Sequence, residues 1–125
     1  MKIQEILLID DDRMTNFINK TVIKSEFPDY SPVIFENGLD AIEHIRENPN
    51  TPYLIFLDIN MPIMDGWEFL EALSKDTNQY NLVIHILSSS LDTVDKLKAK
   101  ESDLVSSFLT KPLKKDVLKE LKLGL

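Results

Sequence analysis

The stretch LIFLDINMPIMDG at positions 54–66 joins a continuously apolar run to a polar loop. Four apolar residues in succession predict a short strand that is buried on both faces of a sheet. Asp58 follows this strand directly. Further along, Asp65 precedes Glu68 by three residues, which is the spacing of a helix capping box. The stretch therefore predicts a strand, a loop and a helix in that order.

The same unit of apolar strand and amphipathic helix recurs along the whole chain. Strands are expected at 6–9, 33–35, 54–57, 82–87 and 105–109. Apolar stripes at helical spacing predict five helices, formed by Met14, Phe17, Ile18, Thr21 and Val22, by Leu39, Ala41, Ile42 and Ile45, by Phe69, Leu70 and Leu73, by Leu91, Val94 and Leu97, and by Leu113, Val117, Leu118 and Leu121. Right-handed crossovers between such strands predict an α/β fold, a doubly wound (βα)5 parallel sheet of five strands with helices on both faces.

Length and composition predict one ordered domain covering residues 1–125. The chain has 125 residues, is 43% hydrophobic and 28% charged, and contains no cysteine. The lack of cysteine excludes a disulfide framework, a thiolate metal site and a cysteine nucleophile. No apolar run has the length of a membrane span, and the N-terminus lacks the apolar region of a signal peptide. We therefore expect a soluble cytoplasmic protein without a membrane partner.

The net charge is −7, and it is unevenly distributed. The first 62 residues hold eleven acidic and five basic side chains, whereas the segment Lys96–Lys122 holds eight lysines and four acids. An acidic total argues against sequence-independent nucleic-acid binding, which needs a dense basic surface. The basic segment has two interpretations, a solvated helix face or a surface that attracts an acidic protein partner.

Polar side chains collect where the expected strands end. Asp10, Asp11 and Asp12 follow the first strand, Asp58 the third, Ser88 the fourth and Lys111 the fifth. In a parallel sheet of this kind, ligands bind at the carboxyl ends of the strands. The first and third strands would be neighbours, so their acids would lie together and would need a cation between them. Carboxylate oxygens without histidine or cysteine suit Mg²⁺, and a nearby lysine and hydroxyl suit a phosphoryl group.

In combination these residues resemble the receiver domain of two-component response regulators. The resemblance rests on LLIDDD at 7–12, LDINMPIMDG at 57–66, ILS at 86–88 and Lys111-Pro112, and it covers the chain from about Glu5 onward. It implies the flavodoxin-like receiver fold and a phosphoacceptor switch of a two-component system or phosphorelay, not an enzyme. The implied phosphodonor is a sensor histidine kinase or histidine phosphotransfer protein. With no output domain expected, signalling would pass through protein contacts of the Lys96–Lys122 face.

The resemblance also assigns the acidic residues. It implies that Asp58 accepts a phosphoryl group from a phosphohistidine and becomes an aspartyl phosphate. Asp11 and Asp58 would bind Mg²⁺ directly, Asn60 through its backbone carbonyl and Asp10 through water. This agrees with elementary chemistry, because a carboxylate is a nucleophile at neutral pH without losing a proton.

The remaining site residues follow from the same resemblance. Ser88 would donate its hydroxyl to a phosphoryl oxygen, and Lys111 would pair with the phosphoryl group. The Lys111–Pro112 bond is expected to be cis. Phe108 matches an aromatic that turns inward when Ser88 moves, although a plain core role for Phe108 remains open. Asn60 and Ser90 stand where the family tunes the lifetime of the aspartyl phosphate.

Two further functions compete with the switch. A small phosphohydrolase of the haloacid dehalogenase type would use Asp10 as nucleophile and Asp12 as acid and base. Against it, Met14 occupies a position that calls for threonine or valine, and the Asp58 loop would have no role. A receiver-like scaffold that works without phosphorylation is disfavoured because all the site positions are filled. Asp12 itself has no role in the receiver interpretation and could be a surface residue.

Overall fold

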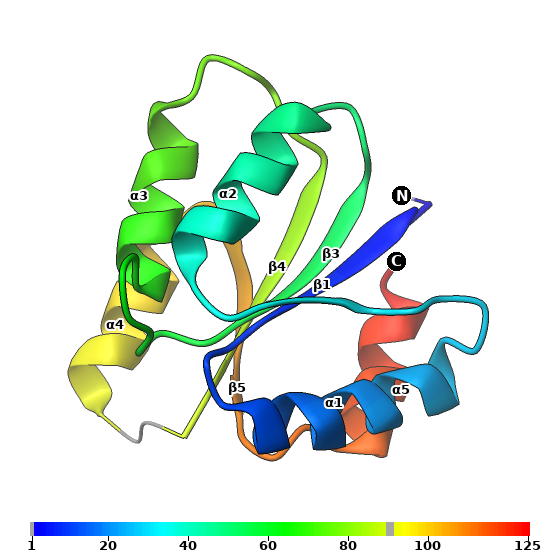
Figure 1. Ribbon diagram of the computed structural model, residues 1–125. Coiled ribbons are helices and arrows are strands. Elements are labelled where there is room, and N and C mark those ends of the chain that lie inside the picture. The colour runs from blue at the N-terminus through cyan, green and yellow to red at the C-terminus, as the bar shows by residue number, and fades with distance from the viewer. Residues whose placement is uncertain (1, 90–91) are drawn as a thin grey trace.

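Strands and helices alternate along the chain in the computed structural model, which describes residues 2–89 and 92–125 (Figure 1). The strands are β1 (Glu5–Ile9), β2 (Val33–Phe35), β3 (Tyr53–Leu57), β4 (Leu82–Ser88) and β5 (Val105–Thr110). The helices are α1 (Arg13–Glu26), α2 (Gly38–Glu47), α3 (Gly66–Lys75), α4 (Thr93–Glu101) and α5 (Lys115–Leu123). None of the helices in the described part of the chain has the length and apolar content that crossing a membrane requires.

All five strands pair in parallel, in the order β2-β1-β3-β4-β5. This confirms the predicted sheet and the predicted pairing of the first and third strands. The chain reverses its direction of winding between β1 and β3, and the crevice at such a switch point is where ligands bind. Ile9 pairs with Leu57 at the carboxyl ends of these strands, and Asp58 N donates to Ile9 O at 2.9 Å. Asp10 and Asp58, which follow these two residues, therefore lie at the same edge of the sheet.

Helices cover the sheet on both sides. α2, α3 and α4 lie on one face, and α1 and α5 on the other (Figure 1). Successive residues of a strand point to opposite faces. Thus Ile55 joins the cluster under α2 and α3, and its neighbour Phe56 joins the cluster under α1 and α5. The continuously apolar strands are buried on both faces for this reason, as predicted.

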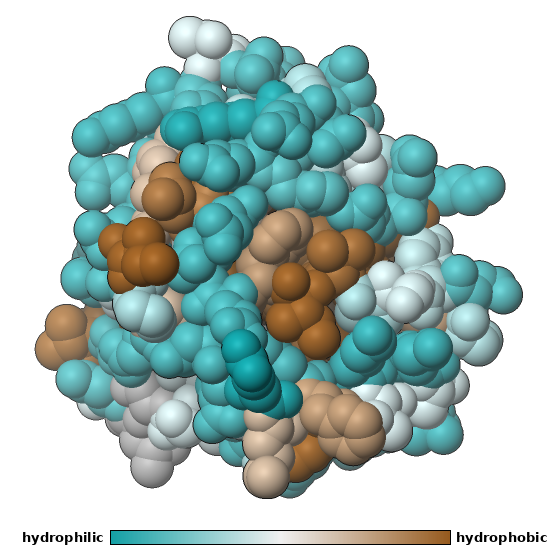
Figure 2. Space-filling model, viewed as in Figure 1, coloured by the Kyte–Doolittle hydropathy of each residue, from teal (hydrophilic) through white to brown (hydrophobic). Residues whose placement is uncertain are grey.

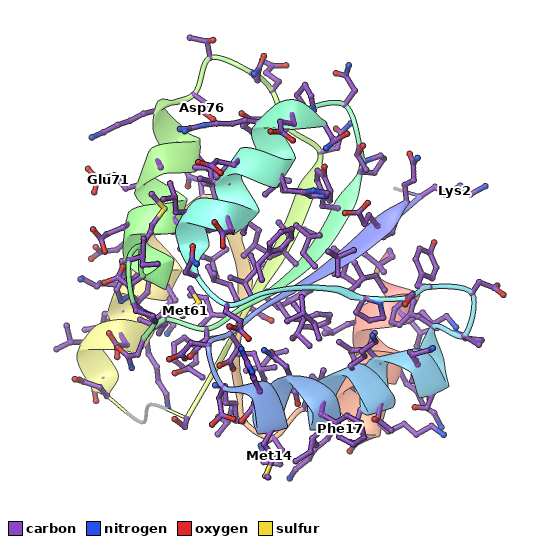
Figure 3. All side chains as sticks on the ribbon, viewed as in Figure 1. Lys2, Met14, Phe17, Met61, Glu71 and Asp76 are labelled. Carbon is purple, nitrogen blue, oxygen red and sulfur yellow. The ribbon has the colours of Figure 1, made fainter. Side chains whose placement is uncertain are left out.

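Most of the predicted inner stripe of α1 is wrong. Met14 is exposed by 74%, Phe17 by 72% and Ile18 by 46%, whereas Val22 of the same stripe packs against the core. Figure 3 labels Met14 and Phe17 at the lower edge, and Figure 2 shows apolar surface there. The buried residues of the helix are Asn16, Asn19 and Ile23. The amides face inward because backbone groups of two loops lie beneath this part of the helix and accept or donate hydrogen bonds there.

The predicted stripe of α4 is also largely exposed. Val94 and Leu97 are 60% and 53% exposed, and the one buried residue of this helix is Ala99. The helix lies against β5 through this small side chain, so its larger apolar residues are left outside. Two residues with sequence-based assignments, Ser90 and Leu91, lie outside the described residues.

Candidate functional site

Three carboxylates meet at the carboxyl edge of the sheet. Ligand oxygens of Asp10, Asp11 and Asp58 all lie within 4.8 Å of one another. Asp10 and Asp58 are buried, whereas Asp11 is exposed. The grouping predicted from the strand ends is therefore present, and it combines a buried pair of acids with one acid open to solvent.

The loop after β3 orients Asp58. Ile59 N donates to Asp58 Oδ1 at 2.9 Å, and Gly66 N donates to Ile59 O at 2.8 Å. The chain passes so close at Gly66 that a Cβ there would lie 2.6 Å from Asp58 O. Asp65 and Glu68 form the predicted capping box, with reciprocal bonds of 2.8 and 3.1 Å. The rigid start of α3 thus holds the backbone on which Asp58 is mounted.

Lys111 enters the cluster from the end of β5. Its Nζ lies 2.5 Å from Asp10 Oδ2 and 3.5 Å from Asp58 Oδ2, and its side chain is 16% exposed. Its backbone N donates to Ser88 O at 2.9 Å, which ties the ends of β4 and β5 together. The Lys111–Pro112 bond is cis, as the family resemblance implies.

Burial and neighbouring charges shift the pKa values of both Asp58 and Lys111. Burial, together with the charge of Asp10, raises the pKa of Asp58 to about 6, and Lys111 opposes this increase. Burial alone would lower the pKa of Lys111, but its hydrogen bond to Asp10 and the nearby carboxylates raise it above the ordinary value. One ammonium group therefore leaves the three carboxylates under-neutralised. An oxygen-only donor set with excess negative charge fits a hard divalent cation such as Mg²⁺.

Asp12 has a structural role that sequence reasoning left open. Its Oδ1 accepts hydrogen bonds from Met14 N at 3.0 Å and Thr15 N at 3.1 Å, so it is the N-cap of α1. The bond from Thr15 N lowers the pKa of this carboxylate. The signal was present in the sequence, since aspartate directly before a helix is a favoured N-cap.

The other predicted residues surround the cluster at different depths. Ser88 is buried at the end of β4, and Asn60 is exposed two residues after Asp58. Ser88 pairs with Thr110, and Phe108 pairs with the residue two before Ser88. Ser88 and half-buried Phe108 consequently point to the same face of neighbouring strands.

Two asparagines on α1 contact the site loops and were missed by the sequence interpretation. Asn16 Nδ2 donates to Asp10 O at 2.7 Å. Leu113 N donates to Asn19 Oδ1 at 3.4 Å. The pattern of apolar residues assigned both amides to the solvent side, and no local signal distinguishes a buried amide from an exposed one.

Comparisons with known proteins agree with this geometry. The family model of the response regulator receiver domain matches residues 6–122. The chemotaxis protein CheY of Halobacterium salinarum is 29% identical, over 90% of this chain and 88% of that protein. A two-component response regulator from Cytophaga hutchinsonii has a similar crystal structure, with a TM-score of 0.82, 32% identity, and coverage of 99% and 97%. The Mn²⁺-bound form of response regulator Rcp1 has a TM-score of 0.74, 27% identity, and coverage of 97% and 90%.

Proposed function

The chain belongs to the family of response regulator receiver domains, the phosphoacceptor switches of two-component signalling, and we propose that Asp58 is its phosphoacceptor. The observation that carries this proposal is the environment of Asp58. The residue is 7% exposed, has a pKa raised to about 6 and faces Lys111 Nζ at 3.5 Å. Receiver domains interact with histidine kinases or phosphotransfer proteins. A sensor histidine kinase or a histidine phosphotransfer protein is therefore the proposed phosphodonor.

In the proposed reaction, a carboxylate oxygen of Asp58 attacks the phosphorus of a phosphohistidine. The new P–O bond forms as the P–N bond breaks, and the imidazole nitrogen keeps the electron pair and takes a proton from solvent. Asp58 is mostly ionised at neutral pH because its pKa of about 6 lies below 7, so the step needs no separate base. The Lys111 ammonium offsets charge on the phosphoryl oxygens, and Ser88 donates its hydroxyl to one of them.

Mg²⁺ is the proposed metal of this site. Asp11 and Asp58 would hold it directly, Asn60 through its backbone carbonyl, and Asp10 through water. When bound, the cation supplies positive charge that offsets both the acid cluster and the phosphoryl oxygens. The oxygen-only donor set and the similarity to the Mn²⁺-bound form of Rcp1 support a divalent cation, because Mn²⁺ and Mg²⁺ share a preference for oxygen ligands.

The proposed output runs through the edge of the sheet that ends in β5. Ser88 and Phe108 share one face of neighbouring strands, which supports their pairing as a switch. Phe108 also lines a groove of about 480 Å³ together with Lys96 and Lys100. The downstream protein would contact this Lys96–Lys122 face. We propose a cytoplasmic protein with neither nucleic-acid nor membrane partners, in keeping with its charge of −7.

The competing functions are less well supported. The Asp12 carboxylate caps α1, so the acid and base that a dehalogenase-type phosphohydrolase needs beside Asp10 is already engaged. Members of the matched family are signalling proteins, and we propose no turnover of a separate substrate. We treat 1–125 as one receiver domain, which the family match over 6–122 supports. Phosphorylation of Asp58 distinguishes the switch from a scaffold that works without phosphorylation.

Incubation with acetyl phosphate and Mg²⁺ tests the assignment of Asp58. The unmodified protein should form an acid-stable, base-labile phosphoryl adduct, and Asp58→Asn should form none. Asp29→Asn, which removes an exposed aspartate outside the site, should retain the adduct. Mass spectrometry of each folded, Mg²⁺-loaded protein gives the result. Absence of the adduct from the unmodified protein would favour the scaffold.

A further inference from the structure

Helix α1 directs two buried amides toward the two loops that carry the charged site residues. Asn16 is 2% exposed, and its Nδ2 donates to the backbone O of Asp10 at 2.7 Å. Asn19 is completely buried, and its Oδ1 accepts from Leu113 N at 3.4 Å. These residues are three positions apart and so occupy the same face of the helix. One rigid element therefore contacts both loops at a fixed spacing.

Packing alone does not explain why amide side chains occupy these two buried positions. Among the residues described, Asn16 Oδ1 and Asn19 Nδ2 are buried side-chain atoms without a hydrogen-bond partner. A buried polar atom that gives up water without gaining a partner destabilises the folded state. Leucine has a similar volume and no polar side-chain atom, but it would remove the hydrogen bonds to Asp10 O and Leu113 N. The two amides therefore contribute through the backbone groups of Asp10 and Leu113 to which they are hydrogen-bonded.

Each of these backbone groups belongs to a segment with a distinct task. Asp10 is a member of the acid cluster, so its main-chain position affects the spacing of the carboxylates. Leu113 follows Lys111 by two residues, and Lys111 Nζ lies 2.5 Å from Asp10 Oδ2. Residues that fix the orientation of ligand-bearing groups influence metal affinity and reactivity without touching the metal or the substrate.

We propose that Asn16 and Asn19 are positioning residues for phosphoryl transfer to Asp58, with separate effects. Asn16 holds the acid cluster and thereby sets the affinity for Mg²⁺. Asn19 holds the segment of Lys111 and thereby sets the rate of phosphoryl transfer once Mg²⁺ is saturating. This inference rests on the proposed phosphoacceptor function.

The test uses the full chain carrying Asn16→Leu, Asn19→Leu or the control Ile23→Ala. Ile23 is also buried on α1, but its side chain has no polar atom with which to hold a site loop. Calorimetry gives the Mg²⁺ affinity, the acetyl phosphate assay gives the adduct rate at saturating Mg²⁺, and thermal unfolding gives stability. A leucine variant without a cooperative unfolding transition is replaced by alanine at the same position, with the same expected results.

Asn16→Leu should weaken Mg²⁺ binding about tenfold and leave the rate at saturating Mg²⁺ within about threefold. Asn19→Leu should leave Mg²⁺ binding within about twofold and slow adduct formation about tenfold. Ile23→Ala should lower the unfolding temperature and change neither quantity. If both asparagine variants behave like Ile23→Ala, the positioning roles are overturned. If the unmodified protein forms no adduct, the phosphoacceptor function fails instead, and the Mg²⁺ titration of Asn16→Leu still tests the first role.

Discussion

At the scale of a single residue, the environment of Asp58 opposes the ionised form that its proposed reaction needs. A nucleophilic carboxylate must be ionised, yet burial and the charge of Asp10 favour its protonated form and raise its pKa to about 6. The positive charge of Lys111 offsets only part of this increase in the pKa of Asp58. The remaining excess of negative charge makes the site a receptor for a cation, so protons and Mg²⁺ should compete for Asp58.

This competition predicts a pH-dependent affinity for Mg²⁺. Above pH 6 Asp58 is ionised and the affinity should be nearly constant. Below pH 6 the ionised fraction, and with it the affinity, should fall about tenfold per pH unit, because metal binding must displace the proton. Calorimetric titrations between pH 7.5 and 5 measure the effect. An affinity that stays constant down to pH 5 would contradict the raised pKa. The transition near pH 6 should be absent from Asp58→Asn.

At the scale of an element, the start of α3 fixes the backbone of the phosphoacceptor. Gly66→Ala should destabilise the protein by about 2 kcal/mol, since a Cβ would press on the main chain of Asp58 and Ile59, which cannot move aside like a flexible side chain. It should also slow adduct formation by displacing Asp58. Chemical denaturation and the acetyl phosphate assay measure the two effects.

Gly124→Ala is the matched control for this prediction. A Cβ at Gly124 meets only Leu121 O, at an ordinary contact distance of 3.5 Å. Its change in stability should stay within about 0.5 kcal/mol. Equal behaviour of the two variants would mean that the close approach at Gly66 has no energetic consequence.

The helices also show which features of an element can be predicted from a local sequence pattern. The stripe on α1 correctly predicted a helix, which ends at Glu26, two residues before Pro28. Except at Val22, the same stripe wrongly predicted which side of the helix is buried. Periodicity reports that one face differs from another, but the partner available in the tertiary structure decides which face is buried. For α1 that partner includes polar backbone from Asp10 and Leu113, which amides satisfy and Phe17 could not.

At the scale of the whole molecule, charge is divided between the site and the β5 edge. The acids gather at the switch point between β1 and β3, while lysines flank β5, which is an edge strand of the sheet. A polyglutamate peptide tests whether this edge attracts acidic partners. Its affinity should fall as salt is added, and it should weaken several-fold further when four exposed lysines are replaced by alanine: Lys96, Lys98, Lys115 and Lys119.

A double variant on another helix controls for total charge. Lys20→Ala with Lys24→Ala removes lysines from α1 and should have a smaller effect per charge on peptide affinity. Fluorescence anisotropy of a labelled peptide gives the affinities at each salt concentration. Binding that is insensitive to salt and to the four substitutions would leave only the solvated-face interpretation of the basic segment.

The sequence by itself determined the order of the elements, the parallel α/β architecture and the family. Those features depend on patterns within short stretches, such as the buried run and loop at 54–66, and on the rule that strand ends share one edge. Only the tertiary structure decided the buried face of α1, the spacing of Asp10 and Lys111, and the raised pKa of Asp58. Burial, distance and electrostatic environment depend on residues far apart in the chain. Asn19 and Leu113, separated by 94 positions, come together only when the chain folds.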